Sequence, residues 1–344
     1  MSPAEAETGT ILYEKNSQEP RPPASIAKMM LELVVMREIE AGRLSLADSI
    51  RVSGRASQLG GSQVFLKQGE VFTLEQMLEA IAIGSANDAC VAVAEHIAGT
   101  PRGFVELMNR EAEVLMLGST EYKNVHGLDD DPNEINMTTA FDISQIARQL
   151  VQFPDVLRMA STAQSTFRDG AFILRNTNDL VGRFPGLDGL KTGYTSKAGF
   201  CLCATAKRDD LRLISVVLGC PTNQGRFATT RELLGLGFGS FLPIEIVSRG
   251  DTLDDAVVVP GGKGPAIQPV AAHDLTVIVS RPDDRLLETR FVRAENLKAP
   301  LEAWDPVGEI QVVVDERVLA TVPAWTPVAV PSSGVVAWFK SLFS

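Results

Sequence analysis

The chain has 344 residues, 45% hydrophobic and 22% charged, which is enough for one large domain or two smaller ones around a substantial core. Its net charge of −11 excludes the basic surface that nucleic-acid binding requires. No apolar run approaches the roughly 18 residues of a membrane-spanning helix. Residues 1–5 lack the basic start and apolar continuation of a signal peptide, so we expect a cytoplasmic protein or a mature or trimmed chain.

Helical patterns dominate the first half of the chain. A strand is predicted over residues 8–15, where it ends in a polar turn. Apolar residues at helical spacing predict a helix over 25–40 and two helices within 74–97, separated near Gly84. Another amphipathic helix is predicted over 140–153.

The periodicity then changes to that of strands. Strands are predicted over 188–195, 200–206 and 211–218, with Arg208-Asp209-Asp210 forming a hairpin turn between the last two. A helix over 229–236 closes this part of the chain. Because strands from both chain ends surround a helical centre, we expect an α+β fold with an antiparallel sheet covered by helices.

A different composition begins beyond Pro243. Short apolar runs separated by glycine, proline and aspartate predict a small all-β domain over 246–330, after a first domain over 1–245. The predicted strands of this second domain lie at 257–259, 275–279, 291–292 and 310–314. A short tail, 331–344, follows, with Val335, Trp338, Phe339 and Leu342 on one helical face.

The four cysteines predict neither a disulfide nor a metal site. Cys201 and Cys203 are two residues apart in a predicted strand, where they share a face in poor disulfide geometry. No Cys-x-x-Cys pair is present, and the chain has only three histidines. We therefore expect Cys90, Cys201, Cys203 and Cys220 to be buried free thiols, with no metal and no cofactor.

Ser25 and Lys28 are the first candidates for chemistry. Three positions apart at the start of a predicted helix, a hydroxyl and an amine lie on one helix face. A serine becomes nucleophilic when a base takes its proton, and a lysine can be that base once burial or nearby cations lower its pKa. The spacing alone is weak evidence, because an N-cap serine beside a solvated lysine has the same pattern.

Two further motifs strengthen this interpretation. Ser85-Ala86-Asn87 lies in the break between two helices, where a hydroxyl can relay protons and an amide can hold an amine or a carbonyl. Residues 188–195 contain Lys191-Thr192-Gly193, in which glycine permits close backbone approach and an exposed strand edge can pair with an extended peptide. Each motif by itself is compatible with an ordinary loop or strand, but their joint occurrence by chance is improbable.

In this order, the three motifs are those of penicillin-binding proteins and serine β-lactamases. The chain resembles the low-molecular-mass penicillin-binding proteins that are serine-type D-alanyl-D-alanine carboxypeptidases, and the resemblance spans nearly its whole length. It rests on TGTILYEKNSQEPRPPASIAKMM, IAIGSANDACVAVAEHIAG, GLDGLKTGYTSKAGFCLCATAKRDDLRLISVVLG and LKAPLEAWDPVGEIQVVVDERVLATVPA. It implies the penicillin-binding transpeptidase fold over 1–245, with a helical subdomain, and a family-type β-rich domain after it.

The resemblance also implies an activity and its residues. Ser25 attacks the carbonyl between two terminal D-alanines of a peptidoglycan stem peptide, and Lys28 takes its proton. β-Lactams acylate the same serine, and the family location is the bacterial cell envelope. The implied supporting residues are Ser85 as proton relay, Asn87 as orienting amide, Lys191 as repelling cation, Gly193 and the backbone N–H of Tyr194 in an oxyanion hole with that of Ser25, and Thr192, Thr195 and Arg226 at the terminal carboxylate.

Some residues depart from the family pattern or suggest other readings. Tyr194 stands where many relatives have histidine, and Thr177 stands where some have arginine, so a role for that arginine is lost. His126 and Asp142 invite a catalytic triad with Ser25, but His126 fits a structural loop residue better. Cys90 follows Asn87 by three residues, and we expect a packed thiol there; a minority hypothesis is that a thiol reagent reaching Cys90 blocks catalysis.

Three other functions stay open at this stage. A β-lactamase is disfavoured because the Pro132–Asn136 loop does not match the Glu-x-x-Leu-Asn context of class A enzymes. These residues do not distinguish a carboxypeptidase from an endopeptidase acting on cross-links. A non-catalytic peptidoglycan-binding protein would be expected to have a broken motif.

The tail carries one positive charge, so any contact it makes with a membrane surface should be weak.

Overall fold

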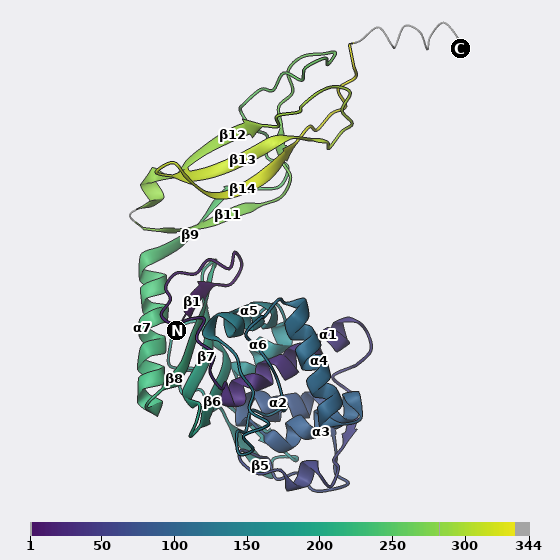
Figure 1. Ribbon diagram of the computed structural model, residues 1–344, viewed down its shortest axis with the longest axis vertical. Coiled ribbons are helices and arrows are strands. Elements are labelled where there is room, and N and C mark those ends of the chain that lie inside the picture. The colour runs from purple at the N-terminus through teal and green to yellow at the C-terminus, as the bar shows by residue number, and fades with distance from the viewer. Residues whose placement is uncertain (1, 282, 334–344) are drawn as a thin grey trace, which may run out of the picture. The chain divides into compact units, whose positions relative to one another are not determined.

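The computed structural model describes residues 2–281 and 283–333 and separates into two compact units, Met1–Gly239 and Ser240–Ser344 (Figure 1). The first unit contains all the predicted site residues. The predicted tail lies outside the described residues from position 334 onward. Within the described part of the chain, no helix has the length and apolar character needed to cross a membrane.

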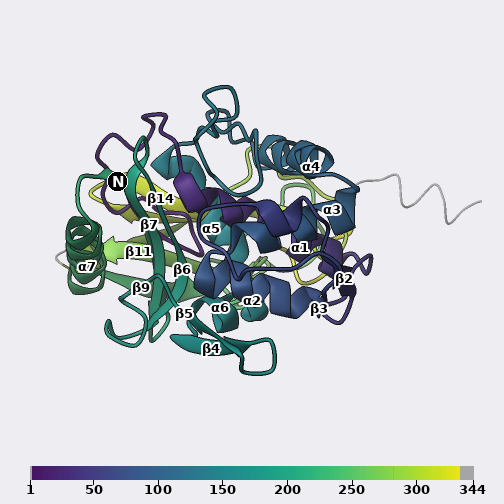
Figure 2. The same ribbon diagram turned by 90° about the horizontal axis from the view of Figure 1, so that it is seen from below.

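A four-stranded antiparallel sheet organises the first unit. Its strand order is β1-β8-β7-β6, formed by Ser2–Glu5, Leu211–Cys220, Gly199–Arg208 and Leu187–Thr195. Helices α1 (Lys28–Glu40), α5 (Ala140–Leu150) and α6 (Pro154–Ala160) lie on one side, and α7 (Asn223–Ser240) lies on the other (Figure 2). The predicted α+β class and the antiparallel sheet between helices are confirmed. Because helices cover both faces, the central strands β7 and β8 are nearly continuous apolar runs.

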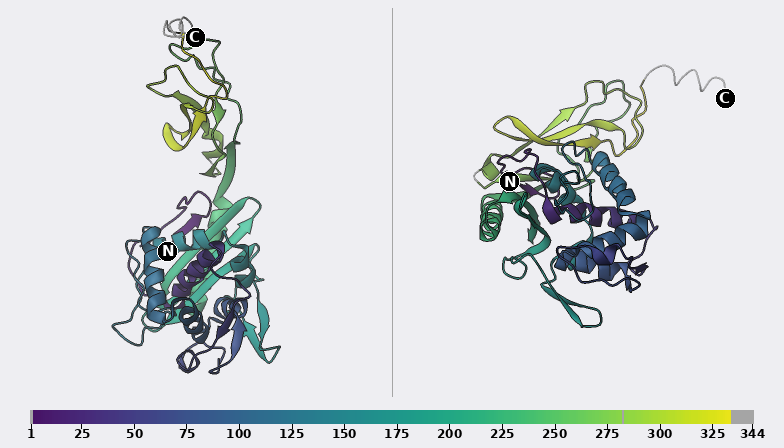
Figure 3. Two further views of the ribbon diagram at one scale, coloured as in Figure 1. Left: turned by 90° about the vertical axis from the view of Figure 1, so that its right-hand side faces the viewer. Right: turned by 60° about the horizontal axis from the view of Figure 1, so that its bottom comes forward.

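Helix α1 lies at the centre of the helical layer (Figure 3). Every residue from Lys28 to Met36 is buried. A short 3₁₀ segment, η1 (Ala24–Ala27), runs directly into it. Around α1 are packed α2 (Leu74–Gly84), α3 (Asn87–Ala98) and α4 (Pro101–Val114). Shorter elements complete this layer: β2 (Ser49–Arg51), η2 (Ala56–Gln58), β3 (Val71–Thr73), β4 (Gln164–Phe167) and β5 (Phe172–Arg175).

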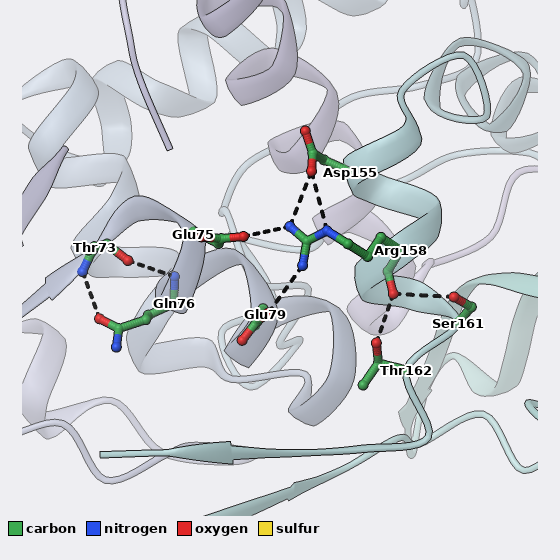
Figure 4. A network of polar contacts seen from close by, with 8 residues as sticks. All are labelled: Thr73, Glu75, Gln76, Glu79, Asp155, Arg158, Ser161 and Thr162. Atoms are coloured by element: carbon green, nitrogen blue, oxygen red, sulfur yellow. Dashed lines mark hydrogen bonds and ion pairs between the residues drawn. The ribbon is translucent and has the colours of Figure 1, made fainter. Parts of the chain in front are cut away.

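The first turn of α2 is fixed by polar contacts (Figure 4). Thr73 caps the helix by accepting from the Gln76 backbone N–H, while the Gln76 side chain accepts from the Thr73 N–H, which forms a capping box. Arg158 on α6 pairs with Glu75 at 2.6 Å and Glu79 at 3.4 Å on α2. These exposed ion pairs add little stability each, but they tie α2 to α6. Ser85 lies at the opposite end of α2.

The N-terminal strand prediction is wrong. Residues 8–15 are mostly irregular, and only Ile11 makes an isolated bridge, to Ala4. The sheet instead takes β1, which pairs with β8 from Ser2↔Val216 to Glu5↔Leu213. The chain then turns back at Glu5, whose carboxylate accepts from the Glu7 and Thr8 backbone N–H groups. The turn occupies the start of the predicted strand, which therefore cannot extend.

Other sequence predictions differ in detail. The two helices within 74–97 are α2 and α3, as predicted, whereas the closing helix α7 is longer than 229–236 at both ends. Three cysteines are buried free thiols, but Cys220 is only half-buried because it lies at the end of β8.

Among its described residues, the second unit contains strands and one short 3₁₀ helix, η3 (Asp283–Leu286). One sheet has the order β10-β14-β13-β12, and β9 pairs with β11 in a second. These strands are β9 (Phe241–Val247), β10 (Val270–Ala271), β11 (Leu275–Ser280), β12 (Glu288–Arg293), β13 (Pro306–Val314) and β14 (Arg317–Trp325). The predicted strand at 257–259 is reduced to an isolated bridge, Val257↔Ile267, and the sequence pattern did not reveal β9 or β14.

Candidate active site

The Lys28 amine is the centre of the site. Its Nζ lies 2.8 Å from Ser25 Oγ, 3.1 Å from Ser85 Oγ and 2.7 Å from Asn87 Oδ1, and it also contacts the Ser85 carbonyl oxygen at 2.9 Å. Lys28 is fully buried, while Ser25 is partly accessible. Ser85 and Asn87, which lie 57 and 59 residues after Lys28, therefore converge on its amine beside the accessible hydroxyl of Ser25.

The backbone before Ser25 is held in an uncommon conformation. Ala24 has a φ of +49°, in the left-handed region that residues with a Cβ rarely adopt. Two glycines pack against this segment: a Cβ at Gly127 would lie 1.9 Å from the Ala24 carbonyl oxygen, and one at Gly193 would lie 2.8 Å from the Pro23 carbonyl oxygen. Both positions require glycine because the backbones approach so closely. The close approach fixes the direction in which η1 presents Ser25.

Ser85 and Asn87 are positioned by the break between α2 and α3. Ser85 ends α2 with a φ of 59°, and its N–H donates to the Ile81 carbonyl. Asn87 begins α3, with its N–H donating to the Ser62 carbonyl and its Nδ2 donating to the Gly60 carbonyl at 2.9 Å. Because Nδ2 is engaged there, Oδ1 faces Lys28. A left-handed serine costs on the order of 1 kcal/mol, a strain found most often at functional sites.

Strand β6 contributes the other wall as the edge strand of its sheet. Lys191 is buried, and its Nζ donates to the Thr192 carbonyl at 3.2 Å. The Thr192 hydroxyl lies 2.6 Å from that of Thr177. The sequence analysis noted Thr177 only because some relatives have arginine at this position. In the structure it contacts Thr192 of the Lys-Thr-Gly motif.

The remaining predicted residues of β6 and α7 have defined partners. Thr195 donates its hydroxyl hydrogen bond to Asp129, and the exposed Tyr194 ring stacks on Phe200. Arg226 is buried, and its Nη1 donates to the Gly193 carbonyl at 2.9 Å and the Cys201 carbonyl at 3.1 Å. The guanidinium therefore holds β6 in place at Gly193, the residue that packs against η1.

The electrostatics of the site favour a neutral lysine. Burial lowers the pKa of Lys28 to about 8, although Cys90, Glu32 and Asp88 oppose the shift. Burial also lowers the pKa of Lys191, and the charge of Lys28 lowers it further. Desolvation disfavours two ammonium groups in one buried cluster, so one of the two gives up its proton first. A lysine that is partly neutral near neutral pH can accept a proton from Ser25.

The residues considered for a triad do not come together. His126 Nδ1 accepts from the Leu128 N–H, and burial lowers the pKa of His126 to about 4. Asp142 accepts from the Thr120 hydroxyl at 2.7 Å instead. Cys90 is buried, its Sγ donates to the Ala86 carbonyl, and burial raises the pKa of the thiol to about 12.

The structure adds residues that the sequence analysis missed. Asp88 is buried and accepts from the Val64 and Leu66 N–H groups, which orders the loop that holds Asn87. Glu32 is a buried carboxylate four residues after Lys28. Both had a readable signal, since each is an acidic residue within a run of apolar or small residues beside a motif. Among the described residues, no group of three or more potential metal ligands gathers.

The geometry defines a class of protein. An accessible serine beside a buried lysine amine, with a second serine and an amide on the same amine, is the set of side chains found in penicillin-binding serine enzymes. The edge strand beside it is suited to an extended peptide. The fold and the site together are those of penicillin-binding serine enzymes.

Comparisons with known proteins agree with this class. Residues 4–222 match the Peptidase_S11 family, described as D-alanyl-D-alanine carboxypeptidase, and residues 241–332 match the penicillin-binding protein 5 C-terminal domain. The chain is 34% identical to the D-alanyl-D-alanine carboxypeptidase DacF of Bacillus subtilis, over 98% of this chain and 86% of that protein. It is 32% identical to DacD of Escherichia coli, over 97% and 86%.

Solved structures give the same result. Penicillin-binding protein 5 from Haemophilus influenzae superimposes with a TM-score of 0.86 at 28% identity, over 96% of each chain. Penicillin-binding protein D2 from Listeria monocytogenes, in its ampicillin-bound form, gives 0.63 at 32% identity, over 69% of this chain and 95% of that one. The chain belongs to the S11 peptidase family, the serine-type D-alanyl-D-alanine carboxypeptidases.

Proposed function

We propose that Ser25 is the nucleophile and Lys28 the general base of this D-alanyl-D-alanine carboxypeptidase. The observation that carries the assignment is the 2.8 Å separation between Ser25 Oγ and a buried lysine amine whose pKa is lowered to about 8. Lys28 accepts the Ser25 hydroxyl proton while Oγ attacks the carbonyl carbon between the two terminal D-alanines. The proton then passes through the Ser85 hydroxyl to the leaving nitrogen, the C–N bond breaks, and D-alanine departs.

The second half of the reaction reuses the same base. Lys28, neutral again, takes a proton from water while the oxygen attacks the acyl carbon; the ester bond to Ser25 then breaks as Lys28 returns that proton to Ser25 Oγ. Asn87 Oδ1, at 2.7 Å, keeps the amine oriented through both steps. The products are a peptide shortened by one D-alanine and regenerated enzyme.

The oxyanion is held by backbone donors in this proposal. Gly193 packs so closely on η1 that a Cβ there would lie 3.1 Å from the Ser25 nitrogen, which brings the peptide unit leading to Tyr194 beside that of Ser25. Their two N–H groups form the oxyanion hole, worth a few kcal/mol of barrier. Thr192 and Thr195 meet the terminal carboxylate. Arg226 contributes positive field from behind β6 and holds the strand in place.

The substrate that we assign is a peptidoglycan stem pentapeptide, in the bacterial cell envelope, where such peptides occur. A β-lactam would acylate Ser25 by the same attack, in keeping with the ampicillin- and cefotaxime-bound forms of the Listeria relative. The domain limits 1–245 and 246–330 remain predictions. So does weak membrane contact by the tail; vesicle co-sedimentation of chains with and without residues 331–344 would test it.

The decisive experiment compares wild type with Ser25→Ala and, as a matched control, Ser161→Ala. Each protein is incubated with fluorescent penicillin, with a pentapeptide ending in D-Ala-D-Ala, and with a cross-linked peptide dimer. We expect a covalent label and free D-alanine from wild type and the Ser161 variant, and neither from Ser25→Ala. A label on Ser25→Ala, or no D-alanine from wild type, contradicts the assignment, and cleavage of the dimer alone would indicate an endopeptidase.

A further inference from the structure

A cavity of about 650 Å³ lies in the first unit between α3, α4 and two loops. Buried apolar side chains line part of it: Val91 on α3, Val105 on α4 and Val125 are each less than a tenth exposed. An apolar surface with a few charged groups around it is typical of a site for a small molecule or a side chain. The charged residues that line the cavity are all exposed, and they are Arg55, Arg102, Glu106, Lys123 and Glu134.

The cavity begins one helical turn from the active site. Helix α3 starts at Asn87, which contacts Lys28, and Val91 follows on the same helix face, about 6 Å further along the axis. Leu59, another lining residue, directly precedes Gly60, whose carbonyl accepts from Asn87 Nδ2 at 2.9 Å. Since an extended peptide advances about 3.3–3.6 Å per residue, the cavity is within reach of a side chain one or two residues from the attacked carbonyl.

The loop on the other side of the cavity is held in place by a buried amide. Asn124 Nδ2 donates to the Leu128 carbonyl at 3.0 Å and to the Glu134 carbonyl at 2.5 Å. Asn124 Oδ1 accepts from the Gly127 N–H at 2.6 Å. Gly127 in turn packs against the backbone that leads into Ser25. The same loop therefore forms one wall of the cavity and supports the active site.

Two opposite charges on α4 face this cavity without using each other. Arg102 and Glu106 are four residues apart on the helix, a spacing at which opposite charges can pair. Neither side chain makes a hydrogen bond or an ion pair anywhere in the part of the chain that the structure describes. By contrast, Lys123 lies 3.7 Å from a carboxylate oxygen of Glu121. The cavity thus offers one cation and one anion, about 6 Å apart along α4, to an occupant.

We propose that this cavity receives the side chain of the substrate residue that precedes D-Ala-D-Ala, and that it selects a diamino acid whose side chain ends in both an ammonium and a carboxylate. The inference rests on the proposed function and names the class of residue that the substrate carries at this position. The methylene groups of the side chain lie against the buried valines. Its carboxylate pairs with Arg102 and its ammonium with Glu106. Arg102 and Glu106 are specificity-determining residues, since they contact the substrate away from the reacting carbonyl.

The chemistry of the two partners sets the order of preference. A side chain with both charges pairs with both residues. A side chain with one charge leaves either Arg102 or Glu106 unmatched, and a neutral side chain of the same length leaves both unmatched. One partly exposed ion pair corresponds to a factor of about five in affinity, so two correspond to roughly 25-fold.

The test measures kcat and KM for D-alanine release from two peptides that differ only in the residue before D-Ala-D-Ala. One peptide carries diaminopimelate with a free ammonium and carboxylate there, and the other carries Nε-acetyl-lysine. The proteins are wild type, Arg102→Ala, Glu106→Gln and Arg110→Ala. Arg110 is the matched control because it is exposed on the same helix but does not line the cavity.

We expect wild type and Arg110→Ala to prefer the diaminopimelate peptide by about 10- to 25-fold in kcat/KM. Arg102→Ala and Glu106→Gln should each reduce that preference about fivefold, mainly through KM, and should leave the acetyl-lysine peptide unaffected. Labelling by fluorescent penicillin should proceed at the wild-type rate in all four proteins, because the changed side chains lie outside the reacting groups. Equal rates with both peptides in wild type, or an undiminished preference in Arg102→Ala and Glu106→Gln, would overturn the proposal.

Binding to Ser25→Ala separates this inference from the proposed function, because calorimetry needs no turnover. If Ser25→Ala binds the diaminopimelate peptide at least fivefold more tightly than the acetyl-lysine peptide, the cavity assignment stands even where wild type releases no D-alanine. In that case the proposed reaction is what fails. If wild type releases D-alanine from both peptides equally well and Ser25→Ala binds them equally, the reaction stands and the cavity assignment is wrong.

Discussion

Gly193→Ala tests whether close backbone packing aligns Ser25, the proposed nucleophile. The added Cβ would lie 2.8 Å from the Pro23 carbonyl oxygen and 3.1 Å from both Ala24 Cβ and the Ser25 nitrogen. None of these is a flexible side-chain end, so either β6 or η1 must move. Since non-bonded carbon atoms rest about 3.5 Å apart, relief requires a displacement of roughly 0.5 Å.

The cost of that displacement falls on the reaction more than on the fold. Overpacking of this kind costs about 1–3 kcal/mol of stability, which a large domain survives. A misplacement of about 1 Å between reacting groups can cost about 100-fold in rate, so half of that predicts a loss of about 10- to 100-fold. The loss should appear in acylation, because the shifted atoms include the Ser25 nitrogen, which we propose as a donor of the oxyanion hole.

The assay is the second-order rate constant for labelling by fluorescent penicillin, measured beside thermal unfolding. Gly235→Ala is the control, because a Cβ there meets nothing within 4 Å and the residue lies in helix α7. It should label at the wild-type rate and be as stable or slightly more stable. If Gly193→Ala labels as fast as Gly235→Ala, the alignment of Ser25 does not depend on this contact and the reasoning is refuted.

Three further outcomes follow from the site. Because Lys28 must be neutral to accept a proton and its pKa is lowered to about 8, labelling by penicillin should rise about tenfold per pH unit below pH 8 and level off above it; a flat profile from pH 6 to 9 would exclude Lys28 as the base. Thr177→Val removes the hydroxyl beside Thr192 and should raise KM about 2- to 10-fold with little change in unfolding temperature, as substrate titrations would show. A maleimide should label the half-buried Cys220 first and leave activity intact, since burial keeps the Cys90 thiol protonated; loss of activity in step with Cys90 modification, by mass spectrometry, would restore the minority hypothesis.

The helices and motifs were readable from the sequence because local signals determine them. Periodicity predicted α1, the α2–α3 pair and α5. Ser25, Ser85 and Lys191 each belong to a short motif whose residues are close together in the sequence, so the motifs can be recognised without the structure. The structure brings Ser25 and Ser85 to the same Lys28 amine and places Lys191 in the same buried cluster. Their roles remain proposals until the variants are assayed.

What the sequence could not supply depends on long-range partners. Strand β1 exists because β8, which is far from it in the sequence, offers an edge for pairing. The turn at Glu5 then occupies the start of the predicted strand. Thr177 and Asp129 matter through contacts with β6, which no local pattern encodes. β14 begins with three exposed residues, Arg317 to Leu319, and contains Pro323, a residue that is uncommon within a strand, so the sequence pattern did not indicate it.

The packing around Ala24 makes activity a reporter of native structure. Gly127 packs against this residue from a loop of the helical layer, and Gly193 packs against the same segment from the sheet. A partly folded chain with α1 formed would still hold Ser25 and Lys28 three residues apart, yet it would lack the second surface that aims the hydroxyl. Penicillin labelling should therefore count only molecules in which both layers have docked, and it can measure the correctly assembled fraction of a preparation where helical content cannot.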